Sequence, residues 1–227
     1  MITTRVQGGA AGNQPAVELP GPAVWAPSPI RLRGPLPRLS DGRVTVRALT
    51  AADAPALLAQ VGSPARLPHV AAGPRSVEEA RSFIRWTHAQ RARGRHLCWG
   101  VVPPDGRHAV GMVQVWPIEH GFSTAEWGFA VGAGFWGTGL FPAAAGLVLH
   151  YLFATVGVRR LEARAGVGNG RGNSVLRKLG ATPEGLLRSG LPQVAASQDH
   201  VMWSLLAGEW FAEHQRSDGC TAVVHER

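Results

Sequence analysis

The spacing of apolar and polar residues predicts a chain in which strands and helices follow one another. Short apolar runs, either continuous or alternating with polar residues, are typical of strands. Seven segments fit this description: 44–49, 97–102, 109–116, 123–131, 160–165, 182–188 and 200–205. Helical spacing or helix punctuation marks 53–60, 76–94, 140–158 and 173–179, and a short helix is expected after 207. This order predicts an α+β domain with a mixed sheet and helices on both faces.

The ends of the chain differ from its middle. Residues 1–29 are rich in Gly, Pro and Ala and show no apolar periodicity, which predicts a disordered leader. The chain has 227 residues, 45% of them apolar, so one domain with its own core is expected. We place that domain at 30–210 and a flexible tail at 211–227.

The segment 123–131 alternates in an informative way. Its odd-numbered residues from Ala125 to Val131 are apolar and share one face of a strand. Glu126 shares the other face with Gly128 and Ala130. A carboxylate beside two very small residues indicates a face with room for a ligand. A glutamate that points to water from an edge strand would give the same pattern, so the strand alone leaves both interpretations open.

A glycine-rich loop, 132–139, joins this strand to the apolar segment 140–158. Glycines allow the backbone to turn tightly, and successive N–H groups can then converge on the positive end of the following helix. Such an arrangement holds a phosphate without a lysine. The loop lacks the Gly-Lys-Ser/Thr of a Walker loop, and a purely structural turn explains a bare glycine loop about as well.

Charge and cysteine content narrow the function classes. The formal net charge is +8, almost all of it from arginine, which favours anionic partners such as a cofactor's phosphates. No basic run is interleaved with aromatic residues, so nucleic acid is the less favoured partner. Cys98 and Cys220 have neither metal-ligand nor disulfide spacing, and the N-terminus lacks a secretory pattern. These features predict a cytoplasmic protein without a metal.

The segment 140–158 is almost uncharged and about as long as a bilayer is thick. It contains Pro142, Gly146 and His150, and it follows the glycine loop directly. We therefore predict a buried core helix and no membrane association.

At this point the sequence resembles the GNAT superfamily of N-acetyltransferases, and within it the ribosomal-protein N-terminal acetyltransferases. The similarity extends from about 30 to 210 and rests on ordered motifs. They are Ala125-Glu-Trp-Gly-Phe129, Phe135-Trp-Gly-Thr-Gly139, the helix from Asn169 to Ala181, Pro183-Glu-Gly-Leu-Leu-Arg188 and Asp199-His-Val-Met-Trp-Ser-Leu-Leu206. The resemblance implies a mostly antiparallel sheet of six to seven strands that splays between the strands ending at Val131 and Ala165.

The resemblance also implies acetyl-CoA as the co-substrate. The pantetheine arm would lie in the splay, beside a bulge in the strand that ends at Val131, and would pair with the backbone around Phe129 and Val131. An N–H group freed there could polarise the thioester carbonyl. Further cofactor contacts are expected from the loop amides and from an asparagine, which could instead cap its own loop. They are Trp136, Gly137, Thr138, Gly139, Leu140 and Asn169.

The implied reaction is direct attack by a neutral amine, whose proton a carboxylate can accept. Glu126 matches the position where that carboxylate often lies. Many relatives carry a tyrosine that protonates the departing thiolate, but this chain has Leu176 there. The family subgroup's serine is replaced by Gly172, so the proton would come from Ser174 or water.

The sequence leaves the following functions open. The first is an N-acetyltransferase acting on a small-molecule or peptide amine, and a homodimer is compatible with it. The second is an acyl-CoA-binding or regulatory module with little turnover, which the missing tyrosine and serine favour. A third, RNA association of a basic protein, predicts binding that weakens steeply with salt.

Overall fold

The computed structural model describes residues 34–62, 73–119, 121–189 and 199–215. These residues form one sheet of eight strands in the order β1-β2-β3-β4-β5-β6-β8-β7. Every neighbouring pair is antiparallel except β5 with β6, which is parallel. The strands are β1 (Leu39–Ser40), β2 (Thr45–Ala48), β3 (Leu97–Val102), β4 (Gly111–Pro117), β5 (Thr124–Val131), β6 (Arg160–Gly166), β7 (Thr182–Leu187) and β8 (His200–Leu206).

The mixed, mostly antiparallel sheet expected from the sequence is confirmed, with one strand more than the six to seven predicted. The additional strand is β1, whose two residues are too few to show a periodicity. The helices are α1 (Ala54–Val61), α2 (Val77–Ala92), α3 (Leu140–Tyr151), α4 (Gly170–Lys178) and α5 (Ala207–Gln215), and a π-helical turn (Leu152–Val156) follows α3.

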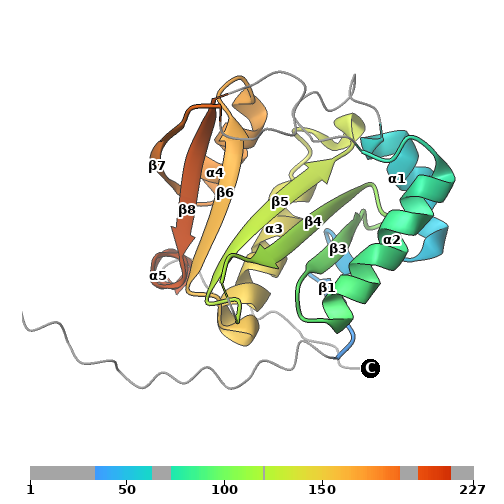
Figure 1. Cartoon of the computed structure of the whole chain (residues 1–227), viewed down its shortest axis with the longest axis horizontal. Helices are drawn as coiled ribbons and strands as arrows, with labels where there is room; N and C mark the ends of the chain where they lie inside the picture. Colours follow the sequence, from blue (N-terminus) through green and yellow to red (C-terminus); the bar gives the residue numbers. More distant parts are fainter. Residues whose placement is uncertain (1–33, 63–72, 120, 190–198, 216–227) are drawn as a thin grey trace, which may run out of the picture.

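Helices lie on both faces of the sheet, as predicted (Figure 1). The larger apolar cluster packs α3, the π-helical turn, α4 and α5 against strand residues such as Trp99 and Trp127. The smaller cluster packs α1 and α2 against residues such as Cys98 and Ala130 on the opposite face. Because β3 and β4 are covered on both faces, their sequences are almost continuously apolar.

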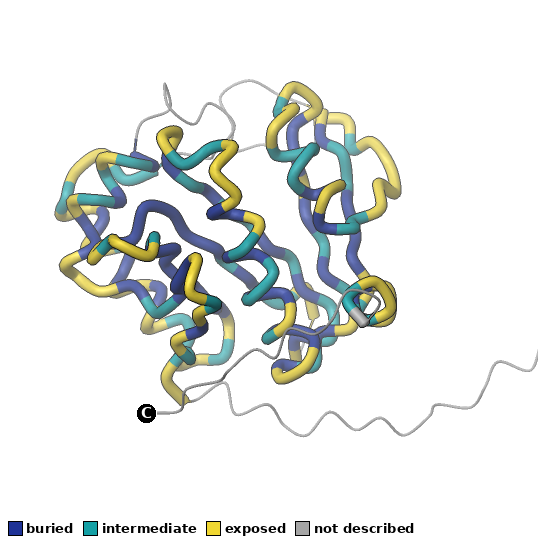
Figure 2. Tube along the Cα trace, turned by 180° about the vertical axis from the view of Figure 1, so that it is seen from behind, coloured by how far each residue is buried: buried dark blue, intermediate teal, exposed yellow. Residues whose placement is uncertain are grey.

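The two helices α1 and α2 cover only part of their face. They lie over β2 to β5, and no described helix lies over β6, β8 and β7 on that side (Figure 1). We call β1 to β5 the covered half of the sheet and β6, β8 and β7 the open half. Seen from behind, buried residues follow the strands and the inner sides of the helices, and the outer edge at β7 is exposed (Figure 2).

Local signals account for where several helices begin. The Ser76 side chain accepts a hydrogen bond from the Glu79 amide at 3.1 Å, so Ser76 caps the beginning of α2. α4 begins at Gly170, three residues earlier than the sequence pattern indicated, because the Asn169 side chain caps it. The expected core helix is also found, since α3 is packed in the larger cluster. In the described part of the chain, no helix has both the length and the apolar character needed to cross a membrane.

Candidate functional site

The parallel strands β5 and β6 form a fork. They pair only at Thr124 with Arg160, Ala125 with Leu161 and Glu126 with Glu162, although β5 continues to Val131 and β6 to Gly166. Beyond Glu126 the two strands share no further pairs. The splay predicted between Val131 and Ala165 is therefore present, and it opens next to the proposed general base.

The bulge expected in β5 is absent. β5 pairs with β4 in unbroken register from Ala125 to Val131, so the fork arises from divergence of β6 rather than from an extra residue in β5. The Thr124 carbonyl and the Gly132 amide both bond to the β4 side. Because backbone groups alternate along a strand, the amides of Phe129 and Val131 point into the fork.

The loop after β5 has open space in front of its backbone. Gly137 and Gly139 have φ values of 75° and 83°, a region that favours glycine, and a Cβ on either would meet nothing within 4 Å. The Trp136 amide donates to the Ala133 carbonyl at 3.2 Å, and the Leu140 amide donates weakly to the Thr138 hydroxyl at 3.3 Å. Among the described residues, the amides of residues 137–139 have no acceptor, so they are the groups that fit an anion.

A cation lies beside this neutral loop although it comes from another element. The Arg171 guanidinium, at the start of α4, lies 4.1 Å from the centre of the Trp136 ring. The Trp136 indole N–H donates to the Val131 carbonyl at 3.0 Å. The pair therefore links the β5 side of the fork to α4. Sequence reasoning missed Arg171, because no local pattern relates it to a loop more than thirty residues away.

Glu126 lies at the base of the fork and is mostly buried. Its Oε1 is 3.6 Å from Nε of Arg164, which projects from β6 beyond the last paired residue. Burial raises the pKa of Glu126, Arg164 and the Trp116 indole lower it, and the neighbouring Glu162 raises it, with a net upward shift. A carboxylate with a raised pKa is a better proton acceptor than an exposed one.

An aromatic wall stands on the β4 side of Glu126. Trp116 is the cross-strand neighbour of Glu126, and its ring lies 3.3 Å from where a Cβ on Gly128 would be. The His96 ring stacks on Trp116 at 6.4 Å, and Trp86 of α2 packs on His96 at 4.9 Å. Gly128 is thus small because the Trp116 indole lies across it. Burial lowers the pKa of His96 to about 4, so this wall is uncharged at neutral pH.

Comparison with known proteins decides the family. A family model described as an acetyltransferase (GNAT) domain matches residues 43–182, more than half of the chain. The chain belongs to the GNAT acetyltransferase family. Members of this family are N-acetyltransferases that use acetyl-CoA.

Relatives of the GNAT domain bear related names. YoaA of Bacillus subtilis, an uncharacterized N-acetyltransferase, is 26% identical over 131 residues, which are 58% of this chain and 74% of YoaA. YdaF of the same organism, provisionally named a ribosomal N-acetyltransferase, is 31% identical over 103 residues, 45% of this chain and 56% of YdaF. The structure of Mycobacterium smegmatis RimJ in complex with CoA-disulfide shares the fold, with 23% identity, a TM-score of 0.62, and coverage of 80% of this chain and 94% of RimJ.

The loop and helix after β6 in this GNAT domain are held by two asparagines. The Asn169 side-chain oxygen accepts from the Gly172 amide at 2.9 Å, which is the capping role considered from the sequence. The Asn173 side chain donates to the Gly166 and Asn169 carbonyls and accepts from the Trp203 indole, each at 2.9 Å. Asn173 is thus a structural residue that sequence reasoning missed. Ser174 lies in α4, and its hydroxyl makes no hydrogen bond with any described residue.

Two aromatic residues, Phe141 and Tyr151, pack with the core of the GNAT domain. The Phe141 ring is buried and stacks on the Phe129 ring at 4.4 Å, so it seals α3 against the sheet. Tyr151 is half-buried against the Trp99 ring at 5.8 Å. Leu176, which the family resemblance places where many relatives have a tyrosine, is buried in the larger cluster.

Proposed function

We propose that this N-acetyltransferase transfers the acetyl group of acetyl-CoA to a primary amine at the base of the β5–β6 fork, with Glu126 as the general base. The observation that carries this proposal is the position of Glu126 at the last paired residue before the fork opens. A base at that point is within reach of an acyl group held in the fork and of an amine that enters from the paired side.

The residues present fit the cofactor. The amides of residues 137–139 would bind the pyrophosphate, with Trp136 and Leu140 shaping the loop and Arg171 supplying the positive charge that the loop lacks. The amides of Phe129 and Val131 would pair with the pantetheine arm, and one of them would donate to the thioester carbonyl oxygen. Asn169 would contribute through its side-chain N–H group, since its oxygen already caps α4.

When bound, acetyl-CoA supplies the thioester carbon that a neutral amine attacks. Glu126 takes the proton that the amine loses, directly or through a water. Burial favours this role because it raises the pKa of Glu126. Ser174 or water supplies the proton for the departing sulfur, because Leu176 offers none.

The acceptor is a primary amine on a small molecule or a peptide. The ribosomal names of some relatives support a peptide α-amine. The buried Leu176 favours a second candidate, an acyl-CoA-binding module with little turnover.

Acetyl-CoA consumption with a panel of small amines and peptides tests the function. Glu126→Gln is expected to lower kcat by about 10²- to 10⁴-fold, the usual contribution of a general base. Acetyl-CoA affinity, measured by calorimetry, should change little, because the side chain is not expected to contact the phosphates.

Glu78→Gln is the matched control, since the same charge is removed from the exposed surface of α2. It should retain wild-type kcat. If Glu126→Gln were as active as wild type, Glu126 would not be the base. If wild type bound acetyl-CoA tightly and turned over none of the amines, the binding-module candidate would replace the enzyme.

A further inference from the structure

A single row of side chains crosses the sheet at the level of the proposed base. Trp116 of β4 pairs with Glu126 of β5. Glu126 in turn pairs with Glu162 of β6, and Glu162 pairs with Ser204 of β8. Paired residues on neighbouring strands point to the same face of a sheet. Ala130 packs in the cluster under α1 and α2, and Glu126 shares its face of β5, so the whole row lies on the α1–α2 face.

The row continues beyond β4 as the aromatic wall, which consists of Trp86, His96 and Trp116. The His96 ring, directly before β3, stacks on Trp116, and Trp86 of α2 packs on His96. Trp86 has 47% of its surface exposed, and Trp116 is only partly buried. Burial lowers the pKa of His96 to about 4, which keeps its ring neutral. The aromatic wall is thus an uncharged, partly accessible surface that ends at Glu126.

The other end of the row is acidic. Glu126 and Glu162 lie opposite each other on neighbouring strands, and such a pair of like charges costs stability. Glu162 accepts a hydrogen bond from the Arg160 guanidinium at 2.8 Å. The Glu126 carboxylate is 3.6 Å from Arg164, which is beyond the usual hydrogen-bond distance. Glu126 therefore retains acceptor capacity for an N–H group, and the two carboxylates together attract an ammonium group.

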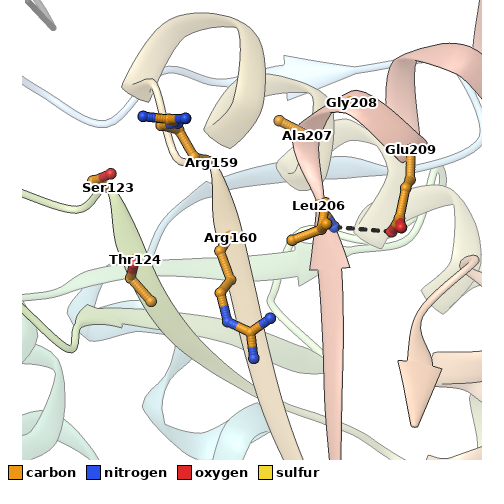
Figure 3. Close-up of a pocket in the computed structure, with 8 residues that line it drawn as sticks. All are labelled: Ser123, Thr124, Arg159, Arg160, Leu206, Ala207, Gly208 and Glu209. Carbon is orange, nitrogen blue, oxygen red and sulfur yellow. Dashed lines mark hydrogen bonds between the residues drawn. The ribbon is translucent and has the colours of Figure 1, made fainter. Parts of the chain in front are cut away.

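The neighbouring row limits where the rest of an acceptor can lie. Arg160 lies between Thr124 and Leu206, and these three residues line an open cavity at the start of β5 and β6 (Figure 3). The Arg160 guanidinium is already held by two carboxylates. A guanidinium repels an ammonium group, and burying it under an apolar group costs free energy. An acceptor whose amine lies at Glu126 therefore gains more by extending over Trp116 than toward this cavity.

We propose that the aromatic wall selects acceptor amines that carry an aromatic or large apolar group close to the amine, and that this group packs on Trp116 while the amine reaches Glu126. This inference rests on the proposed function and names the substrate class of its site. A small arylalkylamine and a peptide with a large apolar first residue share this chemistry. Longer apolar groups extend along the wall toward Trp86 on α2.

Matched acceptors test the inference through the ratio of their kcat/KM values. 2-Phenylethylamine is compared with ethylamine, and peptides that begin with Phe are compared with the same peptides beginning with Gly. Wild type should prefer the aromatic member of each pair by roughly tenfold, the effect of burying part of one ring against another. The pair with the larger preference identifies a small amine or a peptide as the source of the acceptor.

Variants of the aromatic wall should change these ratios in a graded way. Trp116→Ala should bring them close to one, whereas Trp116→Phe keeps a flat ring and should retain most of the preference. A change in the base affects both members of a pair alike, so it cancels in the ratio. Trp86→Ala should reduce the preference for 4-phenylbutylamine over butylamine more than that of the shorter pair, because Trp86 lies at the far end of the wall.

Leu186→Ala is the control, since it removes an exposed apolar side chain from β7 and should keep every ratio. Line broadening of the phenyl resonances in NMR titrations should weaken with Trp116→Ala and persist with Leu186→Ala. If Trp116→Ala does not fold, Trp86→Ala at its exposed position decides through the longer pair of amines.

Equal use of both members of each pair by wild type would overturn the inference and leave acetyl transfer intact. Full retention of the preference in the variants of Trp116 and Trp86 would also overturn it, because the wall would not be the source of the preference. Absence of turnover with every amine would overturn both the inference and the proposed function.

Discussion

The two halves belong to one sheet, but they differ on the face that carries α1 and α2. In the covered half this face is mostly apolar, and all six residues of β3 are buried. In the open half the same face carries a charged network, in which Arg160 joins Glu162 to Glu184 and Ser204 bonds to Glu184. Most of β7 is exposed.

This difference indicates that the two halves of the sheet serve different purposes: the covered half stabilises the fold, and the open half presents charged side chains. Buried apolar area in the covered half stabilises the fold. In the open half, charged side chains stay accessible on a surface that no described helix covers. The fork lies between the halves, where β5 has a covered neighbour on one side and an open one on the other. The acetyl-transfer site that we propose at this boundary combines a rigid frame on one side with an uncovered surface on the other.

The largest expected effect concerns Asp53, a buried carboxylate in the covered half. It accepts from Arg47 at 2.8 and 2.9 Å and from the amides of Thr50 and Ala109. Asp53→Ala removes the ion-pair partner of the half-buried Arg47 and leaves the Thr50 and Ala109 amides without their acceptor, so it should lower the free energy of unfolding by about 3–5 kcal/mol in denaturant titrations. Glu184→Gln removes an exposed partner of Arg160 in the open half and should cost less than about 1 kcal/mol.

The ion pair between Asp53 and Arg47 also predicts how the free energy of unfolding depends on pH. Burial would raise the pKa of Asp53, but its hydrogen bonds to Arg47, Thr50 and Ala109 outweigh this and lower it to about 2. Its stabilising contribution is therefore present above an ordinary carboxyl pKa and lost as the pH falls toward 2. Asp53→Ala should flatten this part of the acid-unfolding curve. If Asp53→Ala and Glu184→Gln lowered the free energy of unfolding equally, the division between the covered and the open half would be wrong.

Smaller effects on stability and on acetyl-CoA affinity are expected from a substitution in the glycine loop that follows β5. Gly139 has a φ of 83°, so Gly139→Ala places a side chain in a left-handed conformation at a cost of about 1–2 kcal/mol. If the loop holds the pyrophosphate, acetyl-CoA should bind roughly tenfold more weakly in calorimetry.

Gly146 provides the matched control. It lies within α3, its φ is not positive, and a Cβ there would meet nothing within 4 Å. Gly146→Ala should therefore stabilise the protein by about 0.5–1 kcal/mol and leave acetyl-CoA affinity unchanged. Unchanged affinity in Gly139→Ala would exclude the loop as the phosphate site.

The smallest effects concern two neighbours of Glu126 on β6. Arg164 lowers the pKa of Glu126 and Glu162 raises it. A general base must be ionised, so kcat/KM should fall as the pH drops below its pKa. Arg164→Gln should move this acidic limb to higher pH and Glu162→Gln should move it to lower pH, changing kcat/KM severalfold at acidic pH. If the two variants moved the acidic limb of the kcat/KM profile in the same direction, a group other than Glu126 would control that limb.

The sequence by itself determined the type and place of most elements. The run from Leu97 to Val102 has the same bounds as β3, and the alternation of 123–131 predicted which face Glu126 occupies. The periodicity of apolar side chains and the capping of helices are local properties of the sequence. They therefore match the folded structure wherever one face of an element is buried. The GNAT motifs are also contiguous, so they could be recognised before any contact was known.

Only the tertiary structure decided how these elements meet. The three-residue pairing of β5 with β6, the approach of Arg171 to Trp136, and the placement of Arg164 beside Glu126 join residues that are more than thirty positions apart. The row formed by Thr124, Arg160 and Leu206 also depends on the register of three strands. Register and divergence are set by packing between elements, and no local pattern encodes which side chain will face which across a sheet.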